Sequence, residues 1–263
     1  MKLIFIPYAG LGNRMRAIAS AYKFSIDNNI GLDIHWNREN GLNASFYSLF
    51  KPVESLKIKD SSFVSYFIYN HPSKTNLTIP KLIDKLFKRK SFYGIGINKL
   101  QELPNENRII CSTYSQQGEL YPLAEIFKPI DEIEKIINDN KRRFGKYTVG
   151  VHIRRTDNIN SIKNSKIELF YEKIDSLFME NPDAKVFLCT DDVKTKEEII
   201  TKWGSEKIIT YNSTLSRNSY KGIRDAVVEL FTLASTDVIW GSYFSSYTEI
   251  ASLLFNKELG IIK

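Results

Sequence analysis

Apolar and polar positions alternate with two different periods along the second half of the chain. Short runs of β-branched and aromatic residues, typical of buried strands, are each followed by a segment that has one apolar helical face. We expect strands over 147–153, 185–190, 207–210 and 237–241, and helices over 167–180, 194–203, 222–235 and 246–255. Strands and helices that alternate at these lengths predict a parallel sheet with helices on both faces.

The first half of the chain opens with the same alternation. We expect a strand over 2–6, a turn that contains Gly10 and Gly12, a helix over 14–28 and a second strand over 32–36. The segment that follows, up to about residue 120, is irregular and rich in Asn, Ser and Lys.

A helix over 131–144 is expected to bridge the two halves, and it begins with a capping box formed by Asp131 and Glu134. The fold class that follows is α/β, with two Rossmann-like lobes whose parallel sheets face each other across a cleft. We place the N-terminal lobe at 1–143 and the C-terminal lobe at 144–263.

The composition mainly excludes some classes of protein. The 263 residues are 43% hydrophobic and 25% charged and include 16 Phe, 14 Tyr and 3 Trp, which suits a globular protein and excludes disorder, collagen and a disulfide scaffold. Every apolar stretch is shorter than the roughly 20 residues of a membrane span, and the run at 1–7 is too short for a signal peptide. Cys111 and Cys189 lie in apolar runs, so we expect buried free thiols in a reducing cytosol.

The net charge of +7 is concentrated in one region. Residues 51–90 hold nine Lys and Arg against three acids, a net of +6, which leaves +1 for the rest of the chain. Within this region, 81–90 predicts a basic amphipathic helix. Two interpretations stay open, a docked surface helix with a solvated basic rim or peripheral contact with an anionic membrane. No nucleic-acid partner is expected, because zinc spacing, RNP-type aromatics and a long basic stripe do not accompany the charge.

Glycines follow the first expected strand, in the sequence Gly10-Leu-Gly-Asn-Arg14. Glycine lets the backbone approach a ligand closely, and a helix N-terminus offers unpaired N–H groups to an anion. The sequence is not the dinucleotide fingerprint, because no third glycine follows. Ordinary turn chemistry is the alternative interpretation.

A histidine, two arginines and an aspartate end a buried strand, in the sequence Gly150-Val-His-Ile-Arg-Arg-Thr-Asp157. Side chains alternate along a strand, so His152 and Arg154 share a face and Arg155 points the other way. Burying such groups is costly unless they are paired or hold a ligand, and ligands of open α/β sheets bind at the carboxyl ends of strands. The arginine fork suits phosphate oxygens, whereas a structural salt bridge to Asp157 is the alternative.

Two further strand ends carry polar residues that one parallel sheet would bring to the same edge. Thr190, Asp191 and Asp192 end one strand, and Ser245 and Ser246 follow another and lead into a helix. Hydroxyl and N–H groups at such a turn hold phosphates, although each group alone is commonly a helix cap. The three polar strand ends together predict a nucleotide-phosphate site.

No metal or other cofactor is expected. His35, His71 and His152 have no ligand spacing, and no pair of cysteines is close in sequence. Asp191 and Asp192 resemble an acidic Mg²⁺ motif of sugar-nucleotide enzymes, but the two arginines already supply the countercharge.

Four motifs of this chain resemble, in their order, the motifs of the fucosyltransferase superfamily, which comprises α1,2-, α1,6- and protein-O-fucosyltransferases. They are Gly10-Leu-Gly-Asn-Arg14, His152-Ile-Arg-Arg-Thr-Asp157, Thr190-Asp-Asp192 and Phe244-Ser-Ser246. The His-x-Arg-Arg-x-Asp element is the most specific of the four. The resemblance implies a GT-B fold with an N-terminal acceptor-side lobe and a C-terminal donor lobe. It also implies inverting, metal-independent transfer from GDP-fucose.

The resemblance further implies roles for single residues. Arg154 matches the arginine that binds the donor diphosphate, His152 matches a histidine that lines the same pocket, and Ser246 matches a serine that contacts phosphate. The implied catalytic residues are Arg154, Arg155 and Asp157. The implied donor-binding residues are Gly10, Gly12, Asn13, Arg14, His152, Arg154, Asp191, Asp192, Asp225, Glu229, Ser245 and Ser246.

Within that donor-binding set, the nucleoside contacts leave one alternative open. Asp191 and Asp192 match paired acids near the nucleoside. Either Glu229 or Asp225 matches the position that faces guanine, and a carboxylate there suits the N1–H and N2–H donors of that base.

The general base also stays open. In the α1,6 branch, a Lys follows the His-x-Arg-Arg-x-Asp element and a Glu a few residues later is the proposed base, whereas this chain has Asn158 and Ile162. Asp157 and acids of the acceptor-side lobe such as Asp33 are the candidates. Protein-O-fucosyltransferases manage without an obvious enzyme base.

We therefore expect a bacterial, cytoplasmic glycosyltransferase of polysaccharide biosynthesis, working in the cytosol or at the inner membrane face. Its donor is GDP-fucose or a related GDP-sugar, and its acceptor is a glycan or a lipid-linked oligosaccharide. The alternative is a non-catalytic nucleotide- or glycan-binding module of the same fold.

Overall fold

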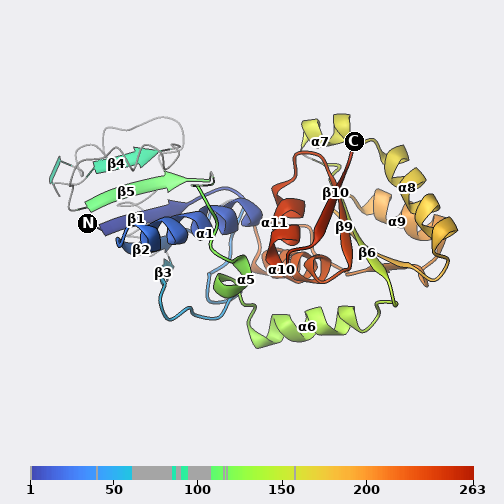
Figure 1. Ribbon diagram of the computed structural model, residues 1–263, viewed down its shortest axis with the longest axis horizontal. Helices are drawn as coiled ribbons and strands as arrows, with labels where there is room; N and C mark the ends of the chain where they lie inside the picture. Colours follow the sequence, from blue (N-terminus) through green and yellow to red (C-terminus); the bar gives the residue numbers. More distant parts are fainter. Residues whose placement is uncertain are drawn as a thin grey trace. The chain divides into compact units, whose positions relative to one another are not determined.

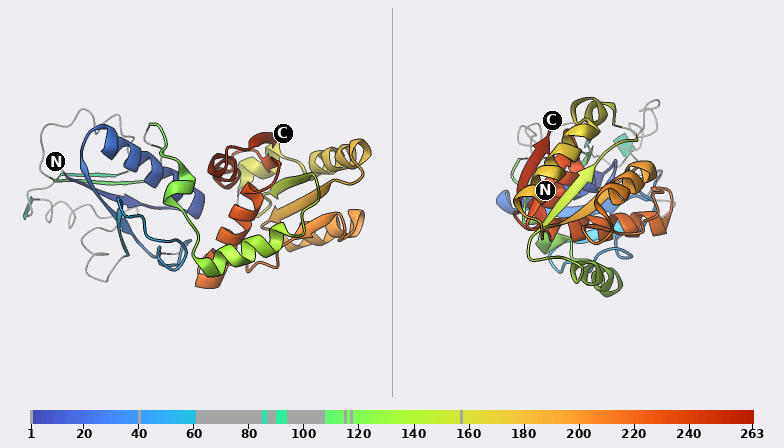
Figure 2. Two further views of the ribbon diagram at one scale, coloured as in Figure 1. Left: turned by 60° about the horizontal axis from the view of Figure 1, so that its bottom comes forward. Right: turned by 90° about the vertical axis from the view of Figure 1, so that its right-hand side faces the viewer.

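A computed structural model describes residues 2–39, 41–60, 85–86, 90–93, 108–114, 116, 118–156 and 158–263. The chain divides into two compact units. The N-terminal unit comprises Met1–Ile130 and Arg217–Ile223, and the C-terminal unit comprises Asp131–Ser216 and Arg224–Lys263. Each unit contains a parallel sheet flanked by helices (Figures 1 and 2).

The N-terminal unit has five parallel strands in the order β3-β2-β1-β5-β4. The strands are β1 (Lys2–Pro7), β2 (Gly31–Trp36), β3 (Lys57–Asp60), β4 (Lys90–Tyr93) and β5 (Arg108–Thr113), and the described helices are α1 (Leu11–Asp27) and α5 (Leu123–Ile126). The strand order reverses between β1 and β5. Such a reversal is a topological switch point, and open α/β sheets bind ligands outside the carboxyl ends of the strands there.

An aromatic cluster orders the irregular segment that follows β2. Trp36 is fully buried, its ring centroid lies 5.5 Å from that of Phe46, and its Nε1 donates a 2.9 Å hydrogen bond to the Ala44 carbonyl. Phe46 and Phe50 in turn contact Phe127, just after α5. Burial of these large rings holds a segment whose polar sequence gave no sign of regular structure.

The C-terminal unit has five parallel strands in the order β10-β9-β6-β7-β8. The strands are β6 (Thr148–Ile153), β7 (Lys185–Thr190), β8 (Ile208–Thr210), β9 (Val238–Ser242) and β10 (Glu258–Ile262). The helices are α6 (Asp131–Lys141), α7 (Ile159–Asn164), α8 (Ile167–Glu180), α9 (Val193–Trp203), α10 (Tyr220–Ala234) and α11 (Ser246–Leu254), of which α10 belongs to this unit from Arg224 onward. The strand order reverses between β6 and β9, which is the switch point of this unit.

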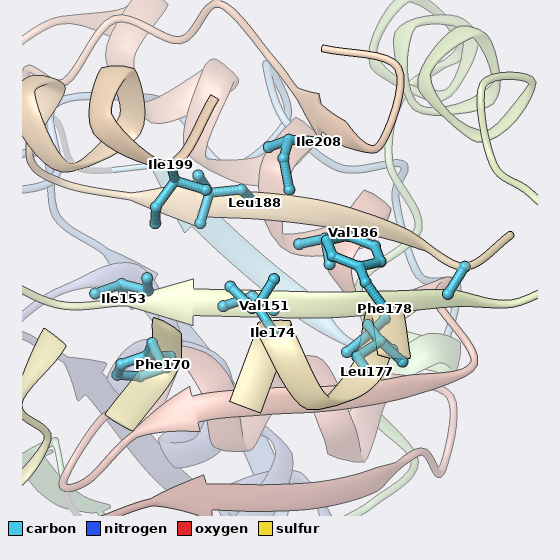
Figure 3. Close-up of a cluster of buried hydrophobic side chains, with 12 residues drawn as sticks. Val151, Ile153, Phe170, Ile174, Leu177, Phe178, Val186, Leu188, Ile199 and Ile208 are labelled. Carbon is cyan, nitrogen blue, oxygen red and sulfur yellow. The ribbon is translucent and has the colours of Figure 1, made fainter. Parts of the chain in front are cut away.

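Alternate residues of β6 face two different layers. Val149, Val151 and Ile153 are fully buried in an apolar cluster with Phe170 and Ile174 of α8, and Figure 3 shows Val151 and Ile153 pointing into this cluster. The residues between them face the opposite side of the strand, as the twofold period of a strand requires.

Two glycines allow close packing on that opposite side. A Cβ on Gly150 of β6 would lie 2.6 Å from Leu233 Cδ1 of α10, and a Cβ on Gly241 of β9 would overlap the side chain of Thr248 on α11. The sheet is therefore covered on both faces, as the alternation of strands and helices predicted.

Apart from the helix predicted over 81–90, each element expected from the sequence is present, with ends that differ by at most three residues. The hydrophobic pattern did not predict β3, β4, β5, β10, α5 and α7. Two of the missed strands have four residues, too few for a period to be visible. Helix α1 begins at Leu11, so Gly12 lies inside the helix instead of in the preceding turn.

The observed division differs from the predicted boundary at residue 143. Helix α6 belongs to the C-terminal unit, where Glu132 pairs with Arg224 at 3.5 Å. Residues 217–223 instead belong to the N-terminal unit, where the Asn43 N–H donates to the Arg217 carbonyl at 3.2 Å. A boundary drawn from local pattern cannot show that a later segment packs back on an earlier unit.

Most of the basic region lies outside the described residues. The structure describes 51–60, 85–86 and 90, so the predicted basic helix over 81–90 and its membrane contact stay predictions. Within the described part of the chain, no helix combines the length and the apolar character needed to cross a membrane. Cys189 is a buried free thiol, as predicted, and the side chain of Cys111 is outside the described set.

Candidate functional site

Two of the predicted motifs meet at the switch point of the C-terminal unit. The turn after β6 contains Arg154 and Arg155, and the turn after β9 leads through Phe244 and Ser245 into α11. Because β6 and β9 are paired and parallel, both turns leave the same edge of the sheet. The topology thus brings together residues that are far apart in the sequence.

His152 connects β6 to the start of α11. Its Nδ1 lies 2.8 Å from Thr248 Oγ1 and 3.4 Å from Ser245 Oγ, and its ring packs against that of Tyr247 with centroids 4.9 Å apart. Burial, together with the nearby positive charge of Arg154, lowers the pKa of His152 to about 4. The imidazole is therefore neutral at pH 7, and it orients hydroxyl groups instead of supplying positive charge.

Asp191 fixes the turn that carries the arginines. One carboxylate oxygen accepts the Arg155 N–H at 2.7 Å, and the other accepts the Thr156 hydroxyl at 2.7 Å and lies 3.2 Å from Arg154 Nε. The Arg154 N–H also donates to Ser242 Oγ at 3.0 Å. The Arg154 side chain is 19% exposed, so a guanidinium in a fixed turn remains accessible at the sheet edge.

Arg155 points to a different neighbour from Arg154, as strand alternation predicted. Its Nη1 donates to the Ser165 carbonyl at 3.3 Å, and the Ser165 hydroxyl accepts the Tyr243 N–H at 2.7 Å. Arg155 therefore helps to join the turn after β6 to the turn after β9, through the short segment that follows α7.

Asp192 is the N-cap of α9. Its Oδ2 accepts the Thr195 N–H at 2.9 Å and the Thr195 hydroxyl at 2.5 Å, and these bonds lower the pKa of the carboxyl group. Together with the turn-fixing role of Asp191, this geometry supports structural functions for the two acids that the resemblance had placed near the nucleoside.

Ser245 and Ser246 lie at the start of α11. Ser245 is the N-cap and its Oγ accepts the Thr248 N–H at 3.5 Å. Ser246 is the first helical residue, and its hydroxyl makes no hydrogen bond to any part of the chain that the structure describes. The hydroxyl and the N–H groups of this helix start are donors of the kind that bind phosphate.

The structure distinguishes the two acids considered for guanine. Asp225 is fully buried and already bonded, since it accepts the Thr214 N–H at 2.9 Å and pairs with Arg224 at 2.9 Å. Glu229, one helical turn later on α10, accepts a 3.0 Å hydrogen bond from Ser213 at Oε1, and its Oε2 has no such donor among the residues that the structure describes. Burial raises the pKa of Glu229 to about 7, the signature of a carboxylate that lacks full compensation. Glu229 is therefore the less fully bonded of the two acids, and its contact with guanine stays a prediction.

The glycine motif of the N-terminal unit is organised around Arg14. Its guanidinium is fully buried, donates to the Ala9 carbonyl at 2.8 Å and to the Asn37 carbonyl at 2.6 Å, and pairs with Glu39. Its guanidinium carbon also lies 5.0 Å from the centre of the Trp36 ring. These contacts support a role for Arg14 in holding the turn in place, in contrast to the direct donor contact that the resemblance implied.

The other residues of this motif have simpler surroundings. Gly10 is the N-cap of α1, and a Cβ added there would have no atom within 4 Å. Asn13 Oδ1 accepts a 3.1 Å hydrogen bond from Arg16. The turn lies at the switch point between β1 and β5, where open α/β sheets bind ligands. Its role in binding the donor stays a prediction.

Both motif turns contain a residue with unusual backbone geometry. Ala9, before Gly10, has a φ of 70°, and Phe244, before Ser245, has a φ of 58°. The other described non-glycine residues with positive φ are asparagines, which tolerate this region well. Strained positions of this kind cluster at functional sites.

The base candidates have different outcomes. Asp157 lies outside the described residues. Asp33 is paired with both Lys2 and Lys59 at 2.9 Å. Burial alone would raise the pKa of Asp33, but the bonds to the two lysines lower it, and the net shift is downward. A carboxylate with a lowered pKa is a poor base. Asn158 caps α7 by accepting the Ser161 N–H at 3.1 Å, so it has a structural task at this departure from the α1,6 pattern.

Sequence reasoning missed several residues that position the site. Ser242, Thr248 and Ser213 each orient a predicted site residue through a hydroxyl group. Single hydroxyls of this kind have no sequence signature, although Gly241 before Ser242 marks a close approach between β9 and α11. Among the residues that the structure describes, no three His, Cys, Asp or Glu side chains are grouped to hold a metal ion; metal independence stays a prediction.

Comparison of the sequence finds no matching protein-family model and no matching curated protein. Comparison of the structure does find similar solved structures. The chain has the GT-B-type fold that solved fucosyltransferases have, with a parallel sheet in each of its two units, as the sequence predicted.

Three solved structures illustrate the likeness. Arabidopsis thaliana FUT1, as the mutant R284K in complex with GDP, has a TM-score of 0.68 and 13% identity over 99% of this chain and 69% of that one. The NodZ α-1,6-fucosyltransferase co-crystallised with GDP, an enzyme also solved from Bradyrhizobium, has a TM-score of 0.67 and 17% identity over 96% and 92%. POFUT1 in complex with GDP-fucose has a TM-score of 0.62 and 13% identity over 99% and 98%.

Proposed function

We propose that this protein is a glycosyltransferase that transfers fucose from GDP-fucose to a hydroxyl group of a glycan or of a lipid-linked oligosaccharide. The fold is shared with fucosyltransferases that were solved with GDP or GDP-fucose, which supports a GDP-sugar donor. The observation that carries the proposal is Arg154, held by Asp191 in a fixed turn at the same sheet edge as the start of α11.

The proposed reaction uses this edge to stabilise the leaving group. The acceptor oxygen forms a bond to C1 of the sugar while the bond from C1 to the β-phosphate oxygen breaks, and the electron pair leaves with GDP. Attack from the side opposite GDP inverts C1. The Arg154 guanidinium and the N–H groups of α11 are directed at the growing charge without reorganisation, and they supply the countercharge that makes the reaction metal-independent in this proposal.

Recognition of the base follows from Glu229. An ionised carboxylate accepts hydrogen bonds from both N1–H and N2–H of guanine, which uracil and cytosine do not offer in this pattern. Within the described part of the chain, Glu229 Oε2 accepts no hydrogen bond, and the Ser213 hydroxyl and the charge of Lys196 offset its burial only in part, so a guanine would supply further donors. The proton of the acceptor hydroxyl passes to a base. Asp157 and a group of the substrate itself are the two candidates for this base.

A thermal-shift panel of GDP, UDP, CMP and TDP, each with and without Mg²⁺, tests the donor. We expect stabilisation by GDP alone, independent of Mg²⁺; stabilisation only by UDP with Mg²⁺ would contradict the proposal. Arg154→Ala should abolish GDP stabilisation and transfer while the melting temperature without ligand stays within a few degrees. Arg142→Ala is the matched control, because Arg142 is an exposed arginine of the same unit that pairs with Asp139.

Release of fucose from GDP-fucose separates an enzyme from a binding module. The purified protein should transfer or hydrolyse the donor, and Arg154→Ala should do neither. GDP binding without turnover on any glycan or lipid-linked acceptor would favour the non-catalytic alternative. Cytoplasmic location and a task in bacterial polysaccharide synthesis are part of this proposal, and fractionation of cells that express the protein tests the location.

A further inference from the structure

Phe244 presents an exposed aromatic ring on a strained backbone. Its φ of 58° lies in the left-handed region, which is a genuine outlier for a bulky side chain, and its side chain is 68% exposed. The neighbouring ring of Tyr243, with its centroid 6.1 Å away, is the aromatic contact that the structure gives it. Phe244 thus carries a local cost and gains little core packing in return.

Three side chains from the segment around α7 hold this conformation. Asn158 Nδ2 donates to the Phe244 carbonyl at 3.0 Å, Ser161 Oγ donates to the Tyr243 carbonyl at 2.6 Å, and the Tyr243 N–H donates to Ser165 Oγ at 2.7 Å. A strained backbone conformation that several hydrogen bonds hold in place indicates a functional position. These bonds fix the backbone that carries the exposed ring.

Phe244 also directly precedes the helix start assigned to the diphosphate. Ser245 caps α11 and lies 3.4 Å from His152 Nδ1, and Ser246 begins the helix. In a nucleotide sugar, the sugar is bonded to the β-phosphate, so the exposed side chain beside the phosphate donors is within reach of the sugar. Ile159, the residue after Asn158 at the start of α7, is a second exposed apolar side chain of this segment, with 79% of its surface accessible.

We propose that the Phe244 ring contacts the apolar C5-methyl side of a 6-deoxyhexose in the donor and selects against donors that carry a hydroxyl at C6. The proposal rests on the proposed function, because it takes the position of the diphosphate from it. Contact with the ring removes the methyl group from water, whereas a C6 hydroxyl on the same face would lose its hydrogen bonds to water without a replacement.

GDP-L-fucose and GDP-L-galactose differ only in the C6 hydroxyl, so they isolate this contact. We expect the wild-type protein to bind GDP-L-fucose about tenfold more tightly than GDP-L-galactose, within the range for one small apolar group. Calorimetric Kd values for both donors and for GDP provide the measurement, and no acceptor is needed.

The variant Phe244→Gly removes the ring and relieves the backbone strain at the same time. We expect its melting temperature to equal or exceed that of the wild type, its Kd for GDP to change by less than about threefold, and its preference for GDP-L-fucose to fall to about onefold. Phe244→Trp should retain the preference. Met179→Ala, which truncates a 76% exposed apolar side chain at the end of α8, should leave all three Kd values unchanged.

The outcomes separate this inference from the proposed function. GDP binding with the same preference in wild type and Phe244→Gly overturns the role of Phe244 and leaves the proposed function standing. A wild type that prefers GDP-L-galactose overturns the inference as well. A wild type that binds no GDP overturns the proposed function, and the inference with it.

Discussion

Thr248 Oγ1 on α11 lies 2.8 Å from His152 Nδ1 on β6, and this bond ties the start of α11 to the strand that leads to Arg154. The approach is close because residue 241 of the intervening strand, β9, is a glycine, and any Cβ there would overlap the side chain of Thr248. The close packing of α11 on β9 therefore also orients the neutral His152 ring.

Gly241→Ala should destabilise the C-terminal unit. The added methyl forces α11 away from β9, and overpacking of this kind costs typically about 1–3 kcal/mol. Unfolding in urea should show this loss, and the Kd for GDP should rise because the start of α11 shifts. Gly10→Ala is the control, since its added Cβ has no atom within 4 Å and we expect less than about 1 kcal/mol there. Equal stability of the two variants would contradict the packing argument.

Asp191→Asn should weaken GDP binding without direct contact between residue 191 and the nucleotide. The variant loses the ion pair with Arg154 and one of the acceptor oxygens that fix the turn, so the guanidinium samples other positions. We expect a Kd about tenfold higher and a loss of about 1–2 kcal/mol in the free energy of unfolding. Asp139→Asn, at an exposed pair with Arg142, is the control and should change neither value.

Donor affinity should depend on pH through Glu229. Its pKa of about 7 means that the carboxylate needed for guanine becomes protonated below pH 7, so GDP affinity should fall by up to about tenfold per pH unit there. Calorimetry between pH 5.5 and 8.5 measures this dependence. In Glu229→Gln the affinity should be weaker at pH 8, and its pH dependence should report only the ionisation of GDP itself. An identical pH profile in the two proteins would argue against guanine contact by Glu229.

The same group affects stability in the opposite direction. Burial raises the pKa of Glu229 from 4.5 to about 7, so the folded state binds a proton more tightly than the unfolded state. The stabilisation that this protonation contributes is full below about pH 4.5 and is lost as the pH rises through 7. Urea unfolding of ligand-free wild type and Glu229→Gln should therefore diverge with rising pH, the wild type losing stability relative to the variant.

Arg14→Met should destabilise the N-terminal unit strongly. The variant leaves the Ala9 and Asn37 carbonyls and the Glu39 carboxylate without their donor. Breaking a buried pair costs about 3–5 kcal/mol, and because the Glu39 side chain is 28% exposed we expect a loss of about 3 kcal/mol. Urea unfolding measures the loss. Arg142→Met, at an exposed pair, should cost less than about 1 kcal/mol. A stable Arg14→Met protein with weakened GDP binding would instead show that Arg14 is a ligand-binding residue.

Local pattern was sufficient for the alternating strands and helices of the C-terminal unit, because each is long enough for its period to be visible. It was also sufficient to place His152, Arg154, Asp191 and Ser245 at strand ends. Pattern failed for short strands such as β3, whose four residues show no period. It also failed for residues 41–50, which are ordered by aromatic side chains that meet only in the folded unit.

The sequence by itself determined the α/β class, the positions of the polar strand ends and the resemblance of its motifs to fucosyltransferases. Only the tertiary structure decided what each polar group does. Arg14 could face a diphosphate and Asp192 the N–H groups of a base, yet both have their partners within the protein, whereas Glu229 Oε2 accepts no hydrogen bond from the described residues. The reason is that a charged residue in a sequence has no fixed partner: the fold sets which charges are compensated, and those left uncompensated are free to bind a ligand.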